Sequence, residues 1–514
     1  MTAGVVGLDA VSDSTVNHIL TNRPAPGAVL RCVRLGEDRV LPLTELYDRA
    51  VALAGRLVER GLRPGDRIGV LAANQLDWVL LDLAALHAGA VVAGMDPAGF
   101  DPDEDLCARY GLHALYTDRR QAGTGVRQLS QVWALSEPRG PVAPSRPRGP
   151  AEPLALKFTS GSTGVPKSMT ASVGSADSSL AAVQEIFRHG PGDDLFVFLP
   201  LSLLQQRYWI YSALRHGHDV VLSTPDAAFE AMGRTEPTVV MGVPGFYEAA
   251  QKRIEMTAAR TGDVKAAARA AFGPRVRYLW TGSAPARPSM IEFYFDVGLP
   301  LYEGYGLNET CIVSKNHPGA SRTGSVGRVL PGKRIRFDDE GVLRIAADFP
   351  VADRYEHAGP GESDAVFVDG EIRTNDTGYV DDDGFLYITG RADDAIVLDN
   401  GRKVLVRGIE EAFREHAAVA ECVVYHVKSR LVAVVSPTSP PADLDDRELA
   451  EAFAGTNARL RPDERVARVI VADEAFTQLN GLLTSQAKPR RARIRDRFRP
   501  RIDDPREGIH VRVD

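Results

Sequence analysis

Apolar residues recur at helical spacing after Thr44, and short apolar runs follow along the first hundred residues. We expect a helix that Thr44 caps and that ends at Gly61. The apolar runs 67–71 and 91–95 predict two buried strands, and the segment 77–87 between them predicts a second helix. This alternation of strands and helices indicates a parallel sheet with crossover helices.

The same alternation returns between residues 194 and 304. Short apolar runs at 197–199, 220–222, 239–241 and 278–280 predict strands that are separated by helical segments. We therefore expect a second α/β unit in the middle of the chain.

The sequence pattern changes after Gly324, where it predicts short strands that alternate with turns rich in Gly and Asp. The segment 378–387 contains an Asp-Gly pair between alternating apolar residues and predicts a β-hairpin. A small α/β tail domain follows from Arg391, with a helix expected at 408–415 and a strand at 420–427. We find no internal repeat of fixed period.

The composition is that of a soluble protein with more than one subdomain: 514 residues, 44% hydrophobic and 25% charged. A net charge of −7 does not favour binding to nucleic acid or to an anionic membrane. The longest apolar stretch, 78–93, is interrupted by Asp82 and His87 and does not predict a membrane span. Four widely separated cysteines and no evident signal peptide favour a cytoplasmic location, without nucleic acid as a partner.

One stretch after an apolar run combines hydroxyl side chains, glycines and a lysine. Glycines let a backbone approach a ligand closely, successive N–H groups bind anions, and the lysine neutralises charge, which suits a polyphosphate. Pro166 stands where a Walker A sequence needs glycine, so we reject that motif. A flexible Ser/Gly surface linker is the alternative interpretation. The candidate residues are Thr159, Ser160, Gly161, Ser162, Thr163, Gly164 and Lys167.

Five motifs occur in a distinctive order: this glycine loop, the segments 302–310, 374–376 and 390–394, and Lys488. The order resembles the adenylate-forming superfamily, which contains acyl-CoA synthetases, adenylation domains of peptide synthetases and luciferases. The motifs are most similar to those of the long-chain acyl-CoA synthetase branch. The segments that carry this closer similarity are 199–202, 302–306, 400–404 and 480–484.

The resemblance implies an acyl-CoA synthetase-like α/β fold in two domains. Residues 1–390 would form a large AMP-binding domain of parallel α/β layers with a small β-barrel-like subdomain. Residues 391–514 would form a small, mobile α+β domain that turns about a hinge at Asp393.

The resemblance also implies a reaction in two steps. An acid attacks the α-phosphate of ATP, which releases pyrophosphate and leaves an acyl-adenylate, and a second nucleophile then displaces AMP. Thr159 to Gly164 and Lys167 would hold the β- and γ-phosphates, and Glu309 would bind Mg²⁺. Lys488 would stabilise charge that builds in the transition state, and Asn308 stands where the family has a threonine at the α-phosphate.

The nucleoside would lie between two backbone segments. The resemblance places Tyr305 against adenine, Asp376 at the ribose hydroxyls and Arg391 near the ribose or a phosphate. The remaining candidates for adenine and ribose contacts are Gly282, Ser283, Ala284, Pro285, Glu303, Gly304 and Gly306.

Aromatic side chains predict the acid pocket and suggest an aromatic or unsaturated carboxylate. Leu203 replaces the histidine or aromatic residue that gates this pocket in the family. Packing of the rings in the core is the alternative interpretation. The candidates are Leu203, Gln206, Trp209, Phe246, Tyr247 and Trp280.

The acceptor in the second step is expected to be the thiol of CoA, given Asn400-Gly401 near the entry to the tail domain. An amine or a carrier-protein thiol is an alternative acceptor. A further alternative activates nitrite and passes it to an arylamine, as in a diazotase. The last alternative is a non-catalytic homologue that binds nucleotide.

Overall fold

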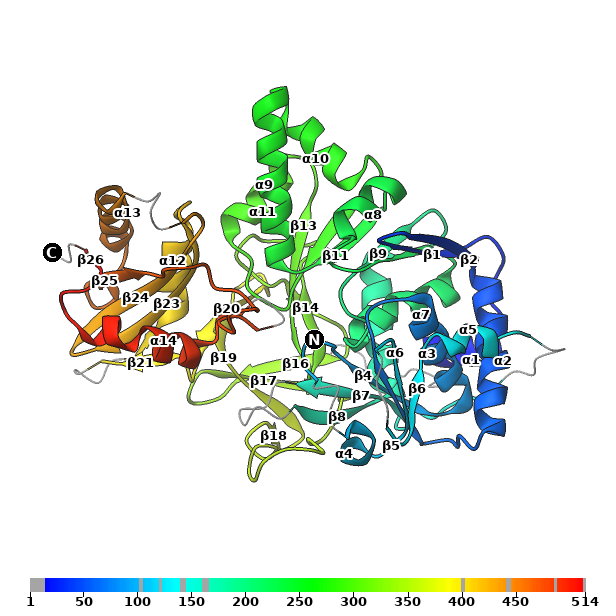
Figure 1. The fold of residues 1–514 in the computed structure, drawn as a ribbon. Helices are drawn as coiled ribbons and strands as arrows, with labels where there is room; N and C mark the ends of the chain where they lie inside the picture. Colours follow the sequence, from blue (N-terminus) through cyan, green and yellow to red (C-terminus); the bar gives the residue numbers. More distant parts are fainter. Residues whose placement is uncertain are drawn as a thin grey trace.

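A large domain and a smaller tail lobe make up the protein, seen in a computed structural model (Figure 1). In Figure 1 the tail lobe, coloured orange to red, lies to one side of the large domain. The structure describes residues 14–100, 105–119, 123–138, 145–159, 166–398, 403–440, 445–484 and 488–511.

A six-stranded sheet organises the first part of the chain, in the order β6-β5-β3-β4-β7-β8. Its neighbours pair in parallel except β8, which returns antiparallel to β7. The strands are β3 (Arg67–Leu71), β4 (Val91–Met95), β5 (Leu112–Thr117), β6 (Val126–Gln128), β7 (Pro153–Thr159) and β8 (Lys167–Ser172).

A nine-stranded sheet follows, in the order β15-β14-β13-β12-β11-β9-β10-β1-β2. The strands from β13 to β1 in this order pair in parallel, whereas β14, β15 and β2 at the two ends are antiparallel. The bounds are β1 (Val29–Arg34), β2 (Glu37–Pro42), β9 (Asp194–Val197), β10 (Asp219–Leu222), β11 (Val239–Gly242), β12 (Tyr278–Thr281), β13 (Leu301–Leu307), β14 (Cys311–Lys315) and β15 (Arg328–Val329).

Helices cover the two sheets and divide the core into layers. One hydrophobic core joins both sheets with α1 (Thr15–Thr21), α2 (Leu43–Glu59), α3 (Leu76–Ala88), α5 (Gln131–Leu135), α6 (Val173–Phe187) and α7 (Leu204–His216). A second core lies on the other face of the nine-stranded sheet, under α8 (Ala228–Thr235), α9 (Pro244–Thr261), α10 (Val264–Phe272) and α11 (Pro288–Asp296). The short α4 (Leu106–Tyr110) packs beside β5 in a third core.

A small antiparallel sheet completes the large domain, with β16 (Lys333–Phe337), β17 (Val342–Ala347), β18 (Phe367–Val368), β19 (Glu371–Val380) and β20 (Leu386–Arg391). β19 and β20 form the hairpin that the sequence predicts, with Tyr379 opposite Tyr387. Gly384 in the turn has φ of +83°, a conformation that favours glycine.

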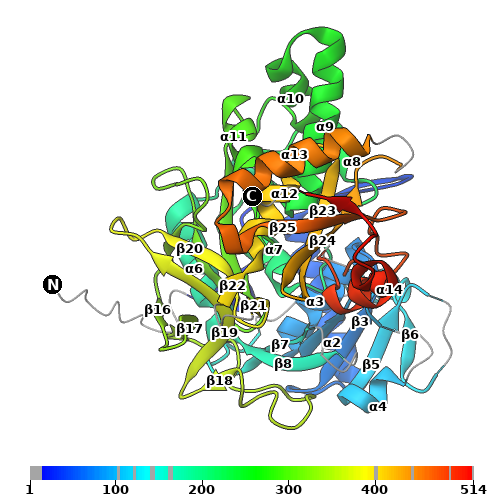
Figure 2. The same cartoon turned by 90° about the vertical axis from the view of Figure 1, so that its left-hand side faces the viewer.

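The tail lobe builds its own core on both faces of a four-stranded sheet (Figure 2). This sheet contains β23 (Val419–Val427), β24 (Arg430–Pro437), β25 (Val466–Val471) and β26 (Ile509–His510). The lobe also contains the pair β21 (Ala395–Val397) and β22 (Lys403–Leu405), the helices α12 (Val406–Arg414), α13 (Asp446–Arg459) and α14 (Arg491–Asp503), and the 3₁₀ turn η2 (Pro462–Glu464).

Most predicted elements are confirmed, and two predictions are wrong in detail. The strands at 67–71 and 91–95 have the predicted bounds, and α3 extends the predicted helix by one residue at each end. Thr44 does not cap α2, because the helix already begins at Leu43 with Pro42 as its N-cap. The strand predicted at 197–199 instead covers Asp194–Val197, where it pairs with β10.

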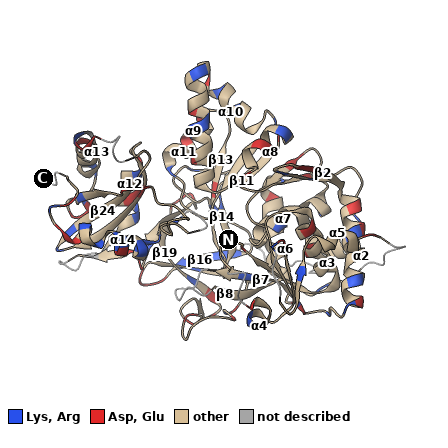
Figure 3. Ribbon diagram, in the orientation of Figure 1, with Lys and Arg blue, Asp and Glu red and all other residues tan. Residues whose placement is uncertain are grey.

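Charged residues of both signs are interspersed over the two domains (Figure 3). All four cysteines carry free thiols. Within the described ranges, no helix is both long enough and apolar enough to cross a membrane.

A buried ion pair connects α3, which lies between two strands of the six-stranded sheet in the chain, with α7, which lies between two strands of the nine-stranded sheet. Arg207 in α7 lies 2.8 Å from Asp82 in α3, and the Tyr211 hydroxyl donates to the same carboxylate at 2.7 Å. Both charged side chains are almost fully buried, at 1% and 4% exposure. Because a buried charge without its partner is strongly disfavoured, this pair ties the two layers together.

We expect Asp82→Ala to lower the free energy of unfolding by about 3–5 kcal/mol, since it leaves the Arg207 guanidinium buried without a counter-charge. Urea titration followed by circular dichroism measures the change. Glu451→Ala, which breaks an exposed pair with Arg447, is the control and should leave the midpoint unchanged. Equal shifts in the two variants would refute the structural role of the buried pair.

Candidate active site

The turn between β13 and β14 is the centre of the candidate site. The two strands pair antiparallel, with an irregularity between Tyr305 and Gly306. A Cβ atom on Gly306 would lie 2.0 Å from the carbonyl oxygen of Cys311, so only glycine fits there. The hairpin thereby presents Asn308 and Glu309 at its tip, where the large sheet meets the small antiparallel sheet.

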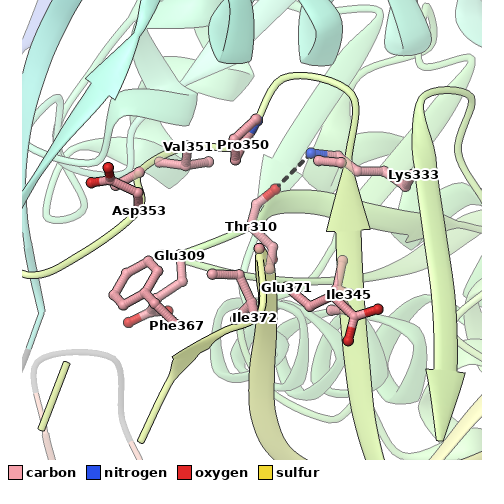
Figure 4. Close-up of a pocket in the computed structure, with 13 residues that line it drawn as sticks. Glu309, Thr310, Lys333, Ile345, Pro350, Val351, Asp353, Phe367, Glu371 and Ile372 are labelled. Atoms are coloured by element: carbon pink, nitrogen blue, oxygen red, sulfur yellow. Dashed lines mark hydrogen bonds between the residues drawn. The ribbon is translucent and has the colours of Figure 1, made fainter. Parts of the chain in front are cut away.

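Two buried lysines hold the main chain of this turn. Lys157 of β7 donates to the carbonyl oxygen of Asn308 at 2.5 Å, and Lys333 of β16 donates to that of Thr310 at 3.0 Å. Burial lowers the pKa of both lysines. Since each lysine comes from a different sheet, the turn is fixed from two sides (Figure 4 shows the second contact).

Tyr305 and Asp376 meet across the hairpin and the small sheet. The Tyr305 hydroxyl donates to Asp376 Oδ2 at 2.5 Å. Asp376 is 7% exposed and stands opposite Arg391 in the β19–β20 register. Burial raises the pKa of the Asp376 carboxyl, while the Tyr305 hydrogen bond opposes this rise. The pair places a ring and a carboxylate side by side, as a nucleoside site requires.

Glu309 is connected to Lys167 through Tyr355. The Tyr355 hydroxyl donates to Glu309 Oε1 at 2.5 Å, and Lys167 Nζ lies 5.1 Å from the centre of the Tyr355 ring. Lys167 also forms an ion pair with Glu362 at 3.2 Å. The lysine predicted to bind phosphate is therefore engaged with a carboxylate in this structure. Its partner in the β7–β8 register is Thr159, and the predicted loop residues Ser160 to Gly164 lie outside the described residues.

A cavity of about 150 Å³ opens beside Glu309, beneath the segment between β17 and β18 (Figure 4). Its lining is mainly apolar, with Val351, Phe367 and Ile372 among the side chains. Among the described residues, no cluster of three or more His, Cys, Asp or Glu side chains could hold a metal alone. A Mg²⁺ ion bound by Glu309 would therefore take its other ligands from phosphate and water, which is the usual pattern for this ion.

Two buried charged residues, Lys315 and Glu303, lie on the strands that flank the turn. Lys315 Nζ donates to the carbonyl oxygens of Tyr302 at 2.7 Å and Thr281 at 3.3 Å, and lies 3.9 Å from the centre of the Trp280 ring. Glu303 accepts from the Ala286 amide at 3.0 Å. Burial raises the pKa of Glu303 to about 7 and lowers that of Lys315 well below its usual range.

Backbone rather than side chains forms the opposite wall of the predicted adenine site. A Cβ atom on Gly282 would lie 3.2 Å from the Gly304 carbonyl oxygen, so the two glycines allow close approach. Ser283 has φ of +68° and is exposed, and Ala284 and Pro285 are half-buried beside it. The residues predicted for adenine contacts thus border the same stretch of β13.

Lys488 reaches the site from the tail lobe. Its side chain is exposed, and it lies close enough to Asp376 and Arg391 for electrostatic interaction. Partial desolvation lowers the pKa of Lys488, the Asp376 carboxylate opposes this change, and Arg391 adds to it. Arg391 itself holds Asp393, the predicted hinge residue, through hydrogen bonds of 2.9 and 3.2 Å.

The predicted acid pocket is divided by the nine-stranded sheet. Trp209 of α7 and Trp280 of β12 lie in the core between the sheets, with ring centres 5.3 Å apart, and Gln206 is buried nearby on α7. Phe246 and Tyr247 belong to the core on the other face. They do not share one wall with the tryptophans, because α9 packs on the face of the sheet opposite to the one where Trp280 points. Leu203 is the N-cap of α7.

Four residues of the site were not predicted from the sequence: Lys157, Lys315, Lys333 and Tyr355. Lys157 interrupts the apolar strand 154–158, and Lys315 ends the strand 311–315. A charged residue inside such a run needs a buried partner, which was the available signal. Lys333 and Tyr355 lie in segments without a comparable pattern.

Comparison with known proteins identifies the family of the chain and its fold. Residues 22–347 match the model of the family described as AMP-binding enzyme. A long-chain-fatty-acid–CoA ligase of Mycobacterium bovis is 27% identical, with 88% of this chain and 90% of the ligase aligned.

Solved structures of similar fold include the o-succinylbenzoate-CoA synthetase of Bacillus subtilis with its acyl-adenylate intermediate bound (TM-score 0.74, 20% identity, 93% of this chain and 96% of that chain). The amide bond synthetase of Marinactinospora thermotolerans also has a similar fold (TM-score 0.73, 23% identity, 94% and 99% covered).

The fold thus defines an adenylate-forming enzyme architecture. The chain belongs to the AMP-binding enzyme family. The resemblance and the fold class predicted from five ordered motifs are confirmed.

The raised pKa of Glu303 gives a prediction about stability. Between pH 4.5 and about 7 the unfolded chain binds fewer protons at this position than the folded one, so stability falls as pH rises. Because glutamine does not titrate, we expect the free energy of unfolding of Glu303→Gln to fall less over this pH range than that of the wild type, by up to about 3 kcal/mol. Urea titrations at several pH values measure it, with exposed Glu59→Gln as the control. Unchanged pH dependence in Glu303→Gln would contradict the assignment.

Proposed function

We propose that the protein is an ATP- and Mg²⁺-dependent acid–CoA ligase, which forms an acyl-adenylate and then transfers the acyl group to the thiol of CoA. One observation carries this proposal: Lys488 from the tail lobe comes close enough to Asp376 of the large domain for electrostatic interaction, and the Tyr305 hydroxyl donates to that same carboxylate. A cation, a diol-binding carboxylate and a ring at one junction match the needs of a nucleoside phosphate that an acid attacks.

In the first step both reactants are anionic, so positioning and positive charge supply most of the catalysis. Lys488 would stabilise the charge that develops between the acid oxygen and the α-phosphate. The Asn308 amide, which donates to the Phe158 carbonyl oxygen at 3.3 Å, lies at the same turn and would orient that phosphate. Mg²⁺ held by Glu309 would neutralise charge on the phosphates.

We propose an aromatic or unsaturated carboxylate as the acid, bound on the side of the sheet where Trp209 and Trp280 lie. The two rings meet edge to face, and aromatic or unsaturated planar groups pack well against such side chains. Phe246 and Tyr247 are left out of this pocket because they pack on the opposite face.

Other acceptors are distinguished by one assay series. Purified protein would be given ATP, Mg²⁺, a panel of acids and radiolabelled pyrophosphate, followed by CoA, amines or a carrier protein. Label exchange with an organic acid and an acyl-CoA product support the proposal. AMP release only with nitrite and an arylamine would replace it with diazotase activity, and binding of ATP without any turnover would indicate a non-catalytic homologue.

We expect Lys488→Ala to slow pyrophosphate exchange by about 10²-fold, because it removes a charge that contacts the transition state. Arg490→Ala is the matched control, since Arg490 is an exposed cation two positions along the same segment. A loss of less than about threefold in Lys488→Ala, or an equal loss in both variants, would remove Lys488 from the catalytic residues.

Glu309→Gln should reduce Mg²⁺-dependent turnover strongly while AMP binding stays close to that of the wild type. The reason is that an amide is a poor Mg²⁺ ligand but can still accept the Tyr355 hydrogen bond. Turnover against Mg²⁺ concentration and calorimetric titration with AMP provide the two measurements. If the Mg²⁺ dependence is unaltered, Glu309 is not the metal ligand.

A further inference from the structure

Four charged side chains from both domains meet at a second contact between the lobes, and none of them is a candidate nucleotide-binding residue. We name them the interlobe cluster: Glu248, Arg287, Arg414 and Glu421. Glu248 lies on α9 and Arg287 precedes α11, whereas Arg414 ends α12 and Glu421 lies on β23. All four side chains are mostly buried, with exposures between 16% and 23%.

Glu248 bridges the two domains because one carboxylate oxygen serves both arginines. Its Oε1 lies 3.2 Å from Arg287 Nε in its own domain and 3.3 Å from Arg414 Nη2 of the tail lobe. Arg287 Nη1 also donates to the Arg414 carbonyl oxygen at 3.1 Å. Beside the cluster, the Ser289 hydroxyl donates to Glu415 Oε2 at 2.7 Å, which adds another contact across the junction.

Each half of the cluster remains paired when the domains separate. Glu248 and Arg287 form an ion pair within the large domain, and Arg414 and Glu421, at 3.4 Å, form one within the tail lobe. Separation therefore breaks the contacts across the junction but leaves no charge without a partner. A junction of this kind is held weakly, so it can open and close. Separating a buried ion pair completely costs much more free energy, because each charge is left without a partner.

The orientation that the cluster holds is the one in which Lys488 comes close enough to Asp376 for electrostatic interaction. We propose that the interlobe cluster fastens the tail lobe in this orientation and so sets the fraction of molecules that can form the adenylate. The four residues act as positioning residues through Lys488, since none of them lies at the nucleotide site. The link to adenylate formation rests on the proposed function, whereas the effect on domain orientation does not.

Glu248→Gln tests the proposal most directly, because it weakens both contacts of the bridging carboxylate and keeps the shape of the side chain. Spin labels at Met256→Cys on α9 and Arg447→Cys on α13, both exposed positions, report the distance between the domains. Half-buried Cys107 is replaced by serine in all samples, and the other cysteines are buried. Pulsed dipolar spectroscopy then gives the populations of the orientations.

We expect the ratio of the fastened orientation to all others to fall about fivefold in Glu248→Gln. Glu248→Lys should lower it further, since it places a third cation beside Arg287 and Arg414. Ser289→Ala should produce a smaller shift in the same direction. Glu255→Gln is the matched control, because Glu255 lies on the same helix, is exposed and bonds only to Gln251 among the described residues.

Kinetics supply a readout that a general loss of structure would not reproduce. Pyrophosphate exchange should fall in proportion to the lost population with an unchanged KM for ATP, while acyl transfer from pre-formed adenylate should not fall. Unaltered distances in both Glu248 variants, or equal losses in the two half-reactions, would overturn the proposal. If the wild type exchanges no labelled pyrophosphate with any acid of the panel, the proposed function fails. The distances between the spin labels still decide whether the cluster fastens the tail lobe.

Discussion

The candidate site depends on one constraint: buried lysines from two sheets hold the carbonyl groups of a single turn. Lys157 and Lys333 are buried, so their ammonium groups require fixed acceptors, which the carbonyl groups of Asn308 and Thr310 provide. Glu309 between these two residues is thereby fixed as well. The need of two buried lysines for hydrogen-bond acceptors thus determines where Glu309 lies beside the cavity.

The large domain and the tail lobe are connected by weaker forces than those that hold the turn. Lys488 is exposed, and the interlobe cluster keeps a neutral ion pair on each side of the junction. Strong burial inside each domain and modest contacts between domains are what the proposed reorientation of the tail lobe would require. This difference in strength suits an enzyme whose two half-reactions need different surroundings.

Local patterns predicted much of the fold, and their failures have identifiable causes. The strands at 67–71 and 91–95 and the hairpin of β19 and β20 follow directly from periodicity and turn chemistry. The strand near 197 was displaced because pairing with β10 selects Asp194–Val197, although the apolar run continues beyond it. Phe246 and Trp280 were grouped by residue type, but strand alternation and helix placement put them on opposite faces of one sheet.

The sequence by itself determined the family and named candidate residues such as Glu309 and Lys488, because each of the five motifs is a short segment and the motifs follow one another in a distinctive order. Tertiary structure alone decided which groups meet. Tyr305 and Asp376 are 71 positions apart, and Lys157 reaches a carbonyl 151 positions away. Such contacts depend on how sheets and lobes pack, and a linear pattern contains no distance between residues that lie on different layers.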